Sequence, residues 1–374
     1  MKVAIVNGFD TFEHRAELLL SFFQTRNYDT VVLQSDFHHI KKEKRQERKE
    51  NFYFFDTKQY KSNLSFQRLY SHWNLSKQIF HYIKQNPVDL LWVLVPPNSF
   101  VREAVALKKQ FPHMTLIFDV IDMWPESIPL GRLNKFFPMT EWARLRDRYI
   151  NMADHIVTEC NLYQDALRSF VSTDKLSTIY LAREEKPMKQ VENVCSNGLS
   201  LCYLGSMNNI IDIPLIAKIV RNIAEESPVT LHLIGDGEKR NELIKKTQLK
   251  NVDVIYHGKI YDEFQKQRIF SSCHFGLNIM KSSVFVGLTM KSIDYFEAGL
   301  PIINNIKGDT WDFVNQLGIG VNTEDGQIPM ASLKKCINKK KVRAFYEKYF
   351  VKNIFELRVA EVLNSVGVTL ENDT

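Results

Sequence analysis

The chain of 374 residues has few cysteines and no long apolar segment. Its five cysteines are scattered and form no C-x-x-C pair, which argues against a disulfide framework and favours reduced thiols. No window reaches the run of about 18 uncharged apolar residues that a membrane-spanning helix needs. The opening residues, MKVAIVNG, are too short for the apolar part of a signal peptide. These absences predict a cytoplasmic protein.

The motifs of common cofactor and nucleophile sites are also missing. Gly8 stands alone, and the G-D-G at 235–237 lacks the third glycine of a dinucleotide-binding loop. There is no G-x-x-x-x-G-K phosphate loop and no G-x-S-x-G nucleophile motif. Metal-ligand spacing is absent as well, because His38 and His39 are adjacent in sequence. We therefore expect no cofactor and no metal.

The sequence does contain the composition of an ordinary globular protein, with 44% apolar and 25% charged residues. Its length predicts two domains, and a cleft between domains is the default ligand site. The net charge is +6, with basic clusters at 41–49, 132–148 and 339–343. Such clusters suit phosphates, nucleic acid or an anionic membrane, or are simply solvated faces. Nucleic acid is the weakest candidate because aromatic residues are not interleaved with them.

A β-branched run followed by a helical pattern recurs along the whole chain, which predicts an α/β fold with parallel sheets. In the first half the expected strands are 2–8, 29–35, 88–96, 114–120 and 155–159, with helices at 13–27 and 101–111. In the second half the expected strands are 199–205, 229–237, 252–258, 273–280 and 300–305, with helices at 212–226, 238–247, from 261 and at 290–298.

The pattern predicts two Rossmann-like doubly wound domains that face a cleft. An N-terminal domain is expected over 1–182, a polar linker over 183–198 and a C-terminal domain over 199–342. The segment 343–374 begins with an aromatic-rich helix, which we expect to pack back across the domain junction toward the N-terminal domain.

The segment KSIDYFEAGLPII, 291–303, carries the clearest chemical pattern. A helix from Met290 to Ala298 puts Lys291 and Asp294 one turn apart on one face. Lys291 offers a cation to phosphate, and Asp294 offers a carboxylate to two ribose hydroxyls. An ordinary i, i+3 surface ion pair is the alternative interpretation.

This segment resembles the K-x-x-E-Y-x-A-x-G-x-P element of retaining glycosyltransferases with the GT-B fold. IFDVIDMWPESIPLG, 117–131, is similar to the D-L-W-P-E-S element of bacterial enzymes that build capsular and other cell-surface polysaccharides. The other segments that follow the family's order are ADHIVTE (153–159), LCYLGSMN (201–208), LHLIGDGEKRNEL (231–243) and YHGKI (256–260). The resemblance thus spans nearly the whole chain.

The resemblance implies a nucleotide-sugar donor of the UDP, dTDP or GDP type, bound without metal. The residues expected around the donor are Gly8, Gly205, Ser206, Gly235, His257, Lys291 and Asp294. The sequence departs from the family pattern, because Asp294 replaces Glu, Val286 stands where an acid is usual, and no Arg/Lys pair follows Gly205. Phosphate charge must then be met by Lys291, by backbone N–H groups at 205–206, by a helix N-terminus, or by Lys281 or Lys307.

The resemblance also implies an acceptor side in the N-terminal domain. Asp122 and Glu126, together with Lys291, are the candidate catalytic residues, and Trp124 is expected to form an aromatic wall for a sugar ring. His14 and Arg15 are placed on the same acceptor side. The alternative is that 124–125 is a packed turn and that Glu126 is an acid at a helix N-terminus.

The expected function is transfer of a sugar from a nucleotide-sugar to a hydroxyl of a lipid-linked glycan, in cell-surface polysaccharide synthesis and with retention. The run 132–146 would then rest on the inner face of the cell membrane through Leu133, Phe136, Phe137, Trp142 and its basic residues. A core helix with a charged outer face is the alternative. Two other functions stay open: a nucleotide-sugar epimerase or hydrolase, and a non-catalytic subunit that supports an active partner.

Overall fold

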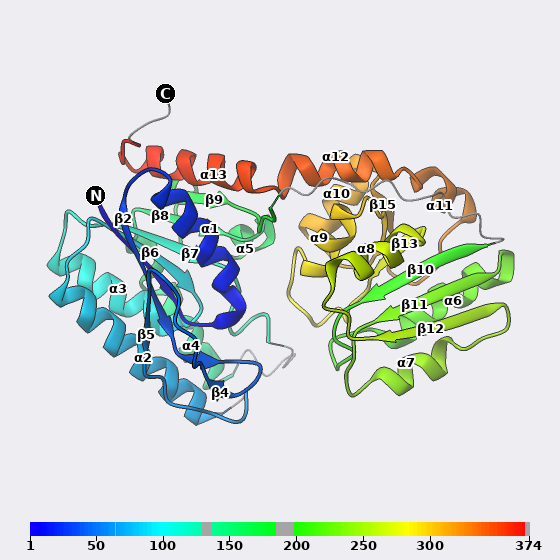
Figure 1. The fold of residues 1–374 in the computed structure, drawn as a ribbon, viewed down its shortest axis with the longest axis horizontal. Coiled ribbons are helices and arrows are strands. Elements are labelled where there is room, and N and C mark those ends of the chain that lie inside the picture. The colour runs from blue at the N-terminus through cyan, green and yellow to red at the C-terminus, as the bar shows by residue number, and fades with distance from the viewer. Residues whose placement is uncertain (64, 129–135, 185–197, 371–374) are drawn as a thin grey trace. The chain divides into compact units, whose positions relative to one another are not determined.

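The computed structural model describes residues 1–63, 65–128, 136–184 and 198–370, and the chain divides into two compact units (Figure 1). The N-terminal unit combines Met1–Arg183 with Lys352–Thr374, and the C-terminal unit is Glu184–Val351. Within the described ranges no helix is both long and apolar enough to cross a membrane. The proposed linker falls almost wholly on 185–197, outside the described residues.

The N-terminal unit is built on a parallel sheet in the order β5-β2-β1-β6-β7-β8-β9. Its strands are β1 Lys2–Asn7, β2 Asp29–Ser35, β3 Phe37–His38, β4 Glu43–Lys44, β5 Phe52–Phe55, β6 Leu90–Val95, β7 Thr115–Val120, β8 His155–Thr158 and β9 Leu176–Thr178, of which β3 and β4 form a separate antiparallel pair. Its helices are α1 Glu13–Gln24, α2 Phe66–Gln85, α3 Asn98–Gln110, α4 Met139–Asp147, α5 Asn161–Leu167 and α13 Lys352–Ser365.

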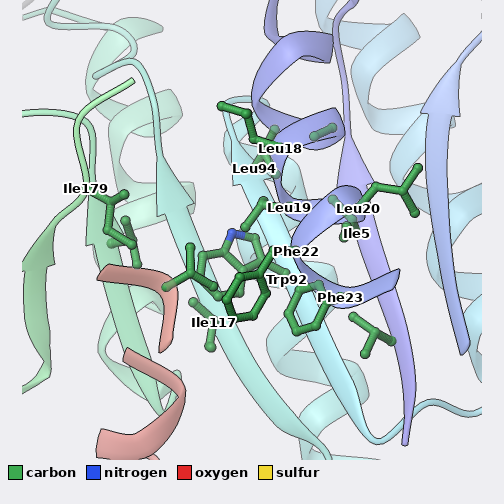
Figure 2. Close-up of a cluster of buried hydrophobic side chains, with 14 of the residues drawn as sticks. Ile5, Leu18, Leu19, Leu20, Phe22, Phe23, Trp92, Leu94, Ile117 and Ile179 are labelled. Atoms are coloured by element: carbon green, nitrogen blue, oxygen red, sulfur yellow. The ribbon is translucent and has the colours of Figure 1, made fainter. Parts of the chain in front are cut away.

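The core of this unit explains its strongly apolar strands. Every residue of β6 is buried, as expected for a parallel strand that is covered on both faces. Figure 2 shows Trp92 of β6 among Leu19, Phe22 and Phe23 of α1. Helix α13 contributes to the same core through its own buried side chains, Phe355, Val359, Val362 and Leu363.

The C-terminal unit contains a second parallel sheet, in the order β12-β11-β10-β13-β14-β15. Its strands are β10 Leu199–Leu204, β11 Val229–Ile234, β12 Val252–Gly258, β13 Phe275–Asn278, β14 Ile302–Asn304 and β15 Gly320–Asn322. Its helices are α6 Ile213–Glu226, α7 Arg240–Thr247, α8 Glu263–Ser271, α9 Met290–Glu297, α10 Asp309–Leu317, α11 Met330–Cys336 and α12 Lys339–Tyr349. The expected α/β architecture with two parallel sheets is confirmed.

Each sheet reverses its strand order at one place, and that place is where open parallel sheets bind ligands. In the N-terminal unit the chain runs outward from β1 to β2 and β5, and then from β6 to β9 on the other side. In the C-terminal unit the reversal lies between β10 and β13. The residues that follow β1, β6, β10 and β13 are therefore the ones that each fold brings to a candidate site.

Several elements differ from the sequence expectation. The strands β3, β4, β5, β9 and β15 and the helices α5, α10 and α11 were not among the expected elements. The single helix expected from residue 343 is two helices, with α12 in the C-terminal unit and α13 in the N-terminal unit. Helix α2 was not expected at all, although it has 20 residues. Its buried face begins with polar side chains, among them Arg68, Ser71 and His72, so the apolar repeat that announces a helix is interrupted.

Candidate functional site

In the C-terminal unit, glycines shape the loops at the carboxyl ends of the strands. Gly205 follows β10 with φ +127°, and its amide donates to the Ile234 carbonyl at 2.9 Å. Gly235 follows β11 with φ +128°, and a Cβ there would lie 2.0 Å from the Gly205 carbonyl oxygen. Gly235 is therefore required by the close approach of the two loops, whereas at Gly205 the positive φ is what favours glycine.

Helix α9 is fastened to this edge by Tyr295. Its hydroxyl accepts a hydrogen bond from the Leu204 amide at 2.7 Å and donates one to the Cys202 carbonyl at 3.1 Å. Gly276 of β13 makes room for the ring, because a Cβ there would lie 2.5 Å from the Tyr295 ring. Tyr295 therefore holds α9 against β10 and β13.

The start of α9 is fixed by a second set of contacts. Thr289 caps the helix, with its hydroxyl accepting from the Ser292 amide in a capping box. The Thr289 hydroxyl also donates to Asn278 Oδ1 at 2.8 Å. Asn278 in turn donates to Asn304 at 2.9 Å, and Asn304 donates to Asn322 at 2.8 Å. This buried asparagine ladder ties the N-terminus of α9 to three neighbouring strands.

The result is that Lys291 lies over the loop that follows β10. Its ammonium is 4.9 Å from the centre of the Tyr203 ring, and the Tyr203 hydroxyl donates to the Ser206 carbonyl at 3.0 Å. Burial alone lowers the pKa of Lys291 from 10.5 to about 7. Across the described ranges, Lys291 has no carboxylate partner. It is a half-buried cation at a helix N-terminus, positioned for an anion.

The spacing in sequence allowed a surface ion pair between Lys291 and Asp294, but Asp294 has another partner. Its carboxylate lies 3.8 Å from the ammonium of Lys266 on α8, and its side chain is 14% exposed. The structure gives Lys291 no contact with it. Asp294 is therefore a partly accessible carboxylate beside a lysine, and its role at a ribose stays a prediction.

The other predicted donor residues lie at the same sheet edge. The Ser206 side chain is exposed directly after Gly205. His257 of β12 lies 2.9 Å from His232 of β11 through their ring nitrogens, and burial lowers the pKa of both imidazoles, that of His232 to about 4. Burial thus favours the neutral form of both imidazoles.

The two further cations considered for phosphate are in different situations. Lys307 forms an ion pair with Glu324, and its ammonium lies 3.2 Å from the centre of the Trp311 ring. Lys281 is exposed, and its amide donates to the Ile210 carbonyl at 2.9 Å, which places it beside the loop after β10. Lys281 therefore fits the phosphate role better than Lys307 does. Within the described residues no cluster of three or more His, Cys, Asp and Glu side chains is arranged to hold a metal ion.

At the edge of the N-terminal sheet, Gly8 is required by a neighbouring loop. A Cβ at Gly8 would lie 2.5 Å from Pro97 Cδ, so the strand reversal between β1 and β6 is closely packed here. Packing against Pro97 thus accounts for the glycine, and the predicted ligand contact of Gly8 stays a prediction. Gly8 also belongs to the N-terminal unit, whereas the other predicted donor residues belong to the C-terminal unit.

Trp124 is a packed residue and not an open wall. Its side chain is 8% exposed, with the Phe9 ring at 5.2 Å, the Trp142 ring at 5.6 Å and His72 stacked on it at 5.8 Å. Its indole N–H donates to Asp122 at 2.6 Å. The packed-turn alternative describes Trp124, and the expectation of a wall for a sugar ring is wrong for this structure.

Glu126 is committed to a buried arginine. Its two carboxylate oxygens accept from Arg146 at 2.7 and 3.0 Å, and Arg146 also donates to the Trp124 carbonyl at 2.9 Å. Arg146 is 1% exposed, so this pair fixes the turn that carries Asp122. The bidentate pair favours a structural role for Glu126 over the predicted catalytic one.

Arg15 and His14 also have partners within the unit. Arg15 is 1% exposed and donates to both Asp119 oxygens at 2.8 and 2.9 Å, which contradicts its placement on an acceptor surface. His14 is partly exposed, and its Nε2 lies 2.9 Å from the Ala182 carbonyl. Of the predicted acceptor-side group, His14 and Asp122 keep partial exposure.

Glu159 was missed by the sequence reasoning. It follows β8, its amide donates to the Val120 carbonyl at 3.0 Å, and the neighbouring Asp122 follows β7. Burial raises the pKa of Glu159 to about 8, against the opposing charge of Arg15 and with a further rise from Asp122. Burial likewise raises the pKa of Asp122. The quoted segment 153–159 ended on this residue, and a carboxyl at the end of an apolar strand was the available signal.

The amphipathic run 132–146 is only partly exposed. Trp142 is 8% exposed and Arg146 is buried, which corrects their assignment to a membrane face. Phe136 and Phe137 are 62% and 82% exposed, as the membrane interpretation expects. The part of the run up to residue 135, with Leu133 and the basic residues 132 and 135, lies outside the described residues.

Comparison with known proteins places the candidate donor site in a recognised domain. Residues 198–329 match the family model described as Glycosyl transferases group 1, and no curated protein sequence matches the chain. The structure is similar to HepE of Anabaena in complex with UDP, at 13% identity and TM-score 0.66, covering 98% of this chain and 100% of that one.

Two further solved structures are similar over nearly their full length. The lipopolysaccharide outer core galactosyltransferase WaaB is 16% identical, with TM-score 0.68 and coverage of 98% of this chain and 99% of that one. Sucrose-phosphate synthase from Thermosynechococcus elongatus is 10% identical, with TM-score 0.66 and coverage of 98% and 99%. At these identities the likeness establishes the two-domain GT-B fold.

Proposed function

The chain carries a Glycosyl transferases group 1 domain within a GT-B fold, and from this premise we propose that it moves a sugar from a nucleotide-sugar to a hydroxyl of a glycan acceptor. The C-terminal unit holds the donor. HepE, whose fold is similar, is known in complex with UDP, which supports UDP as the first nucleotide to test.

Lys291 is the observation that carries the proposal. A half-buried ammonium without a carboxylate partner in the described chain is costly, since burial disfavours its charged form. The cost is offset when an anion binds beside it. The contacts of Tyr295, Thr289 and Asn278 hold Lys291 at the strand reversal, where a nucleotide diphosphate is expected.

In the proposed reaction the bond between C1 of the sugar and the diphosphate oxygen breaks, and its electron pair leaves with the diphosphate. C1 then bonds to the acceptor oxygen, and the hydroxyl proton passes to the leaving phosphate. Lys291 stabilises the charge that develops on the leaving group, and Asp294 accepts hydrogen bonds from the ribose. Anomeric configuration is retained in this proposal, which the anomeric proton coupling of the product tests.

The acceptor belongs to the N-terminal unit in this proposal, and it is a lipid-linked glycan used in cell-surface polysaccharide synthesis. Asp122 is the residue proposed to bind its hydroxyl, next to the carboxyl of Glu159. The protein would act in the cytoplasm, with exposed Phe136 and Phe137 touching the inner face of the membrane. Flotation with liposomes that shows no dependence on anionic lipid would exclude this contact.

The test of the donor site is calorimetric titration with UDP, dTDP and GDP, with and without Mg²⁺. We expect one nucleotide to bind without metal, and Asp294→Asn to lose about 1.5–3 kcal/mol, the value of a hydrogen bond to a charged group. Glu225→Gln, an exposed carboxylate on α6, is the matched control and should leave the affinity unchanged.

The other outcomes separate the alternatives. If none of the nucleotides binds, the enzyme proposal fails and a supporting subunit becomes the better description. Binding followed by donor consumption in the absence of acceptor would indicate a hydrolase or an epimerase.

A further inference from the structure

A second binding site is suggested by a pocket in the N-terminal unit, between the start of α2 and the start of α4. The pocket has a volume of about 230 Å³. Its walls are apolar, formed by Phe66, Leu69, Met139 and Trp142, and its polar groups include Arg68 and Asn63. None of these residues entered the proposed reaction.

Arg68 is the unusual member of this pocket. It is 5% exposed, and its guanidinium lies 4.2 Å from the centre of the Trp124 ring. One terminal nitrogen donates to the Asn63 carbonyl at 2.7 Å, whereas Nε has no hydrogen-bond partner in the described part of the chain. An arginine stays charged even when burial lowers its pKa, as it does here. Arg68 is thus a buried cation that lines the pocket, and its Nε donor makes no hydrogen bond within the described residues.

Two carboxylates and one further cation lie around Arg68. Asp122 interacts with Arg68 electrostatically, and it also accepts from the Trp124 indole at 2.6 Å. The Lys42 ammonium donates to Asn63 Oδ1 and lies 4.6 Å from the centre of the Tyr60 ring. The nearby Asp10 is occupied, since its oxygens accept from the His39 amide and lie 3.1 Å from His38 Nδ1. Both carboxylates thus have partners of their own, and Arg68 and Lys42 are the cations that an anion at this end of the pocket would meet.

The backbone at the start of α2 also favours a negatively charged ligand. Ser65 caps α2 and accepts from the Arg68 amide at 3.2 Å. The pocket includes Ser65 and the first turn of this 20-residue helix, where N–H groups and the helix dipole attract negative charge. In the same turn, the Phe66 side chain is 83% exposed at the pocket, and an apolar group would cover it.

We propose that this pocket binds the phosphate head and the first carbons of a phosphate-bearing amphiphile, with Arg68 and the first turn of α2 on the phosphate and Phe66, Leu69 and Met139 on the carbon chain. Together with the proposed function, on which this step rests, the ligand is the lipid phosphate of the acceptor. The volume is below the roughly 300–1,000 Å³ of sites that enclose a whole small molecule, which fits a site that holds only the head of a long ligand.

The experiment is calorimetry on the full chain with octyl phosphate below its micelle concentration, compared with inorganic phosphate and with octyl maltoside. We expect octyl phosphate to bind at least about tenfold more tightly than either, because it alone meets both halves of the pocket. Arg68→Met should weaken it about tenfold or more, as expected for a lost charged hydrogen bond. If inorganic phosphate binds as tightly as octyl phosphate, the proposal of an amphiphile is refuted and the pocket is a site for free phosphate.

Two variants keep the test decisive if Arg68→Met fails to fold. Leu69→Trp fills the pocket without touching the charge and should abolish binding of octyl phosphate. Tyr70→Ala alters the neighbouring exposed position on α2 and should change the affinity less than twofold. Undiminished binding to Leu69→Trp would place the ligand elsewhere and refute the proposal.

Titration of the same proteins with UDP separates this site from the donor site. If UDP binds and octyl phosphate does not, the proposed role of the pocket is refuted and the proposed function is retained. Binding of octyl phosphate alone supports the pocket and removes the donor assignment.

Discussion

Replacing Lys291 by Met should stabilise the C-terminal unit and weaken nucleotide binding at the same time. Lys291 is held in a half-buried position where burial lowers its pKa from 10.5 to about 7, and no carboxylate in the described ranges compensates. Met has a similar length and no charge to bury. A residue retained at a cost to stability is expected at a binding site.

The magnitude follows from the two pKa values. A decrease from 10.5 to about 7 corresponds to about 4 kcal/mol against the folded state at pH 7. Between pH 7 and 10.5 the unfolded chain binds more protons than the folded chain, so this penalty shrinks as the pH rises and is nearly absent above 10.5. The lost contact with the Tyr203 ring offsets roughly 0.5–1 kcal/mol. We expect a net gain of about 2–4 kcal/mol at pH 7.

The assay is urea denaturation of wild type and Lys291→Met at pH 7 and pH 10, followed by titration with UDP. Lys245→Met, an exposed lysine on α7, is the matched control and should change stability by less than about 0.5 kcal/mol. The stabilisation should be larger at pH 7 than at pH 10. A variant that is no more stable than wild type at pH 7, or that binds UDP unchanged, would refute the reasoning.

Two further predictions concern the contacts that hold each unit together. Tyr295→Phe leaves the Leu204 amide without its 2.7 Å acceptor and should cost about 1–3 kcal/mol in urea denaturation, whereas Tyr261→Phe, 85% exposed, should cost nothing measurable. Arg15→Met leaves the buried Asp119 carboxylate without its cation and with only the Trp92 indole as a side-chain donor, and should cost about 3–5 kcal/mol, of which a second change, Asp119→Asn, should recover part. An Arg15→Met protein as stable as wild type would contradict the assigned pairing.

The sequence by itself determined the two parallel sheets and the place of α9. Strands such as β6 are buried on both faces, so they appear as uninterrupted apolar runs that can be recognised without a partner. Helix α9 is marked locally by its capping box and by Gly299, which has φ +67° after the helix. The spacing of Lys291 and Asp294 follows from that helix alone.

The tertiary structure decided which polar residues are available to a ligand. Arg15 pairs with a carboxylate 104 residues away, and Glu126 pairs with Arg146 across the turn, so neither role is visible in local spacing. Helix α2 was hidden because the inner face of its first half is polar, and Arg68 of that face lines the pocket. Local patterns report what a segment buries on average, whereas burial and pairing of one side chain depend on residues that only the folded chain brings near.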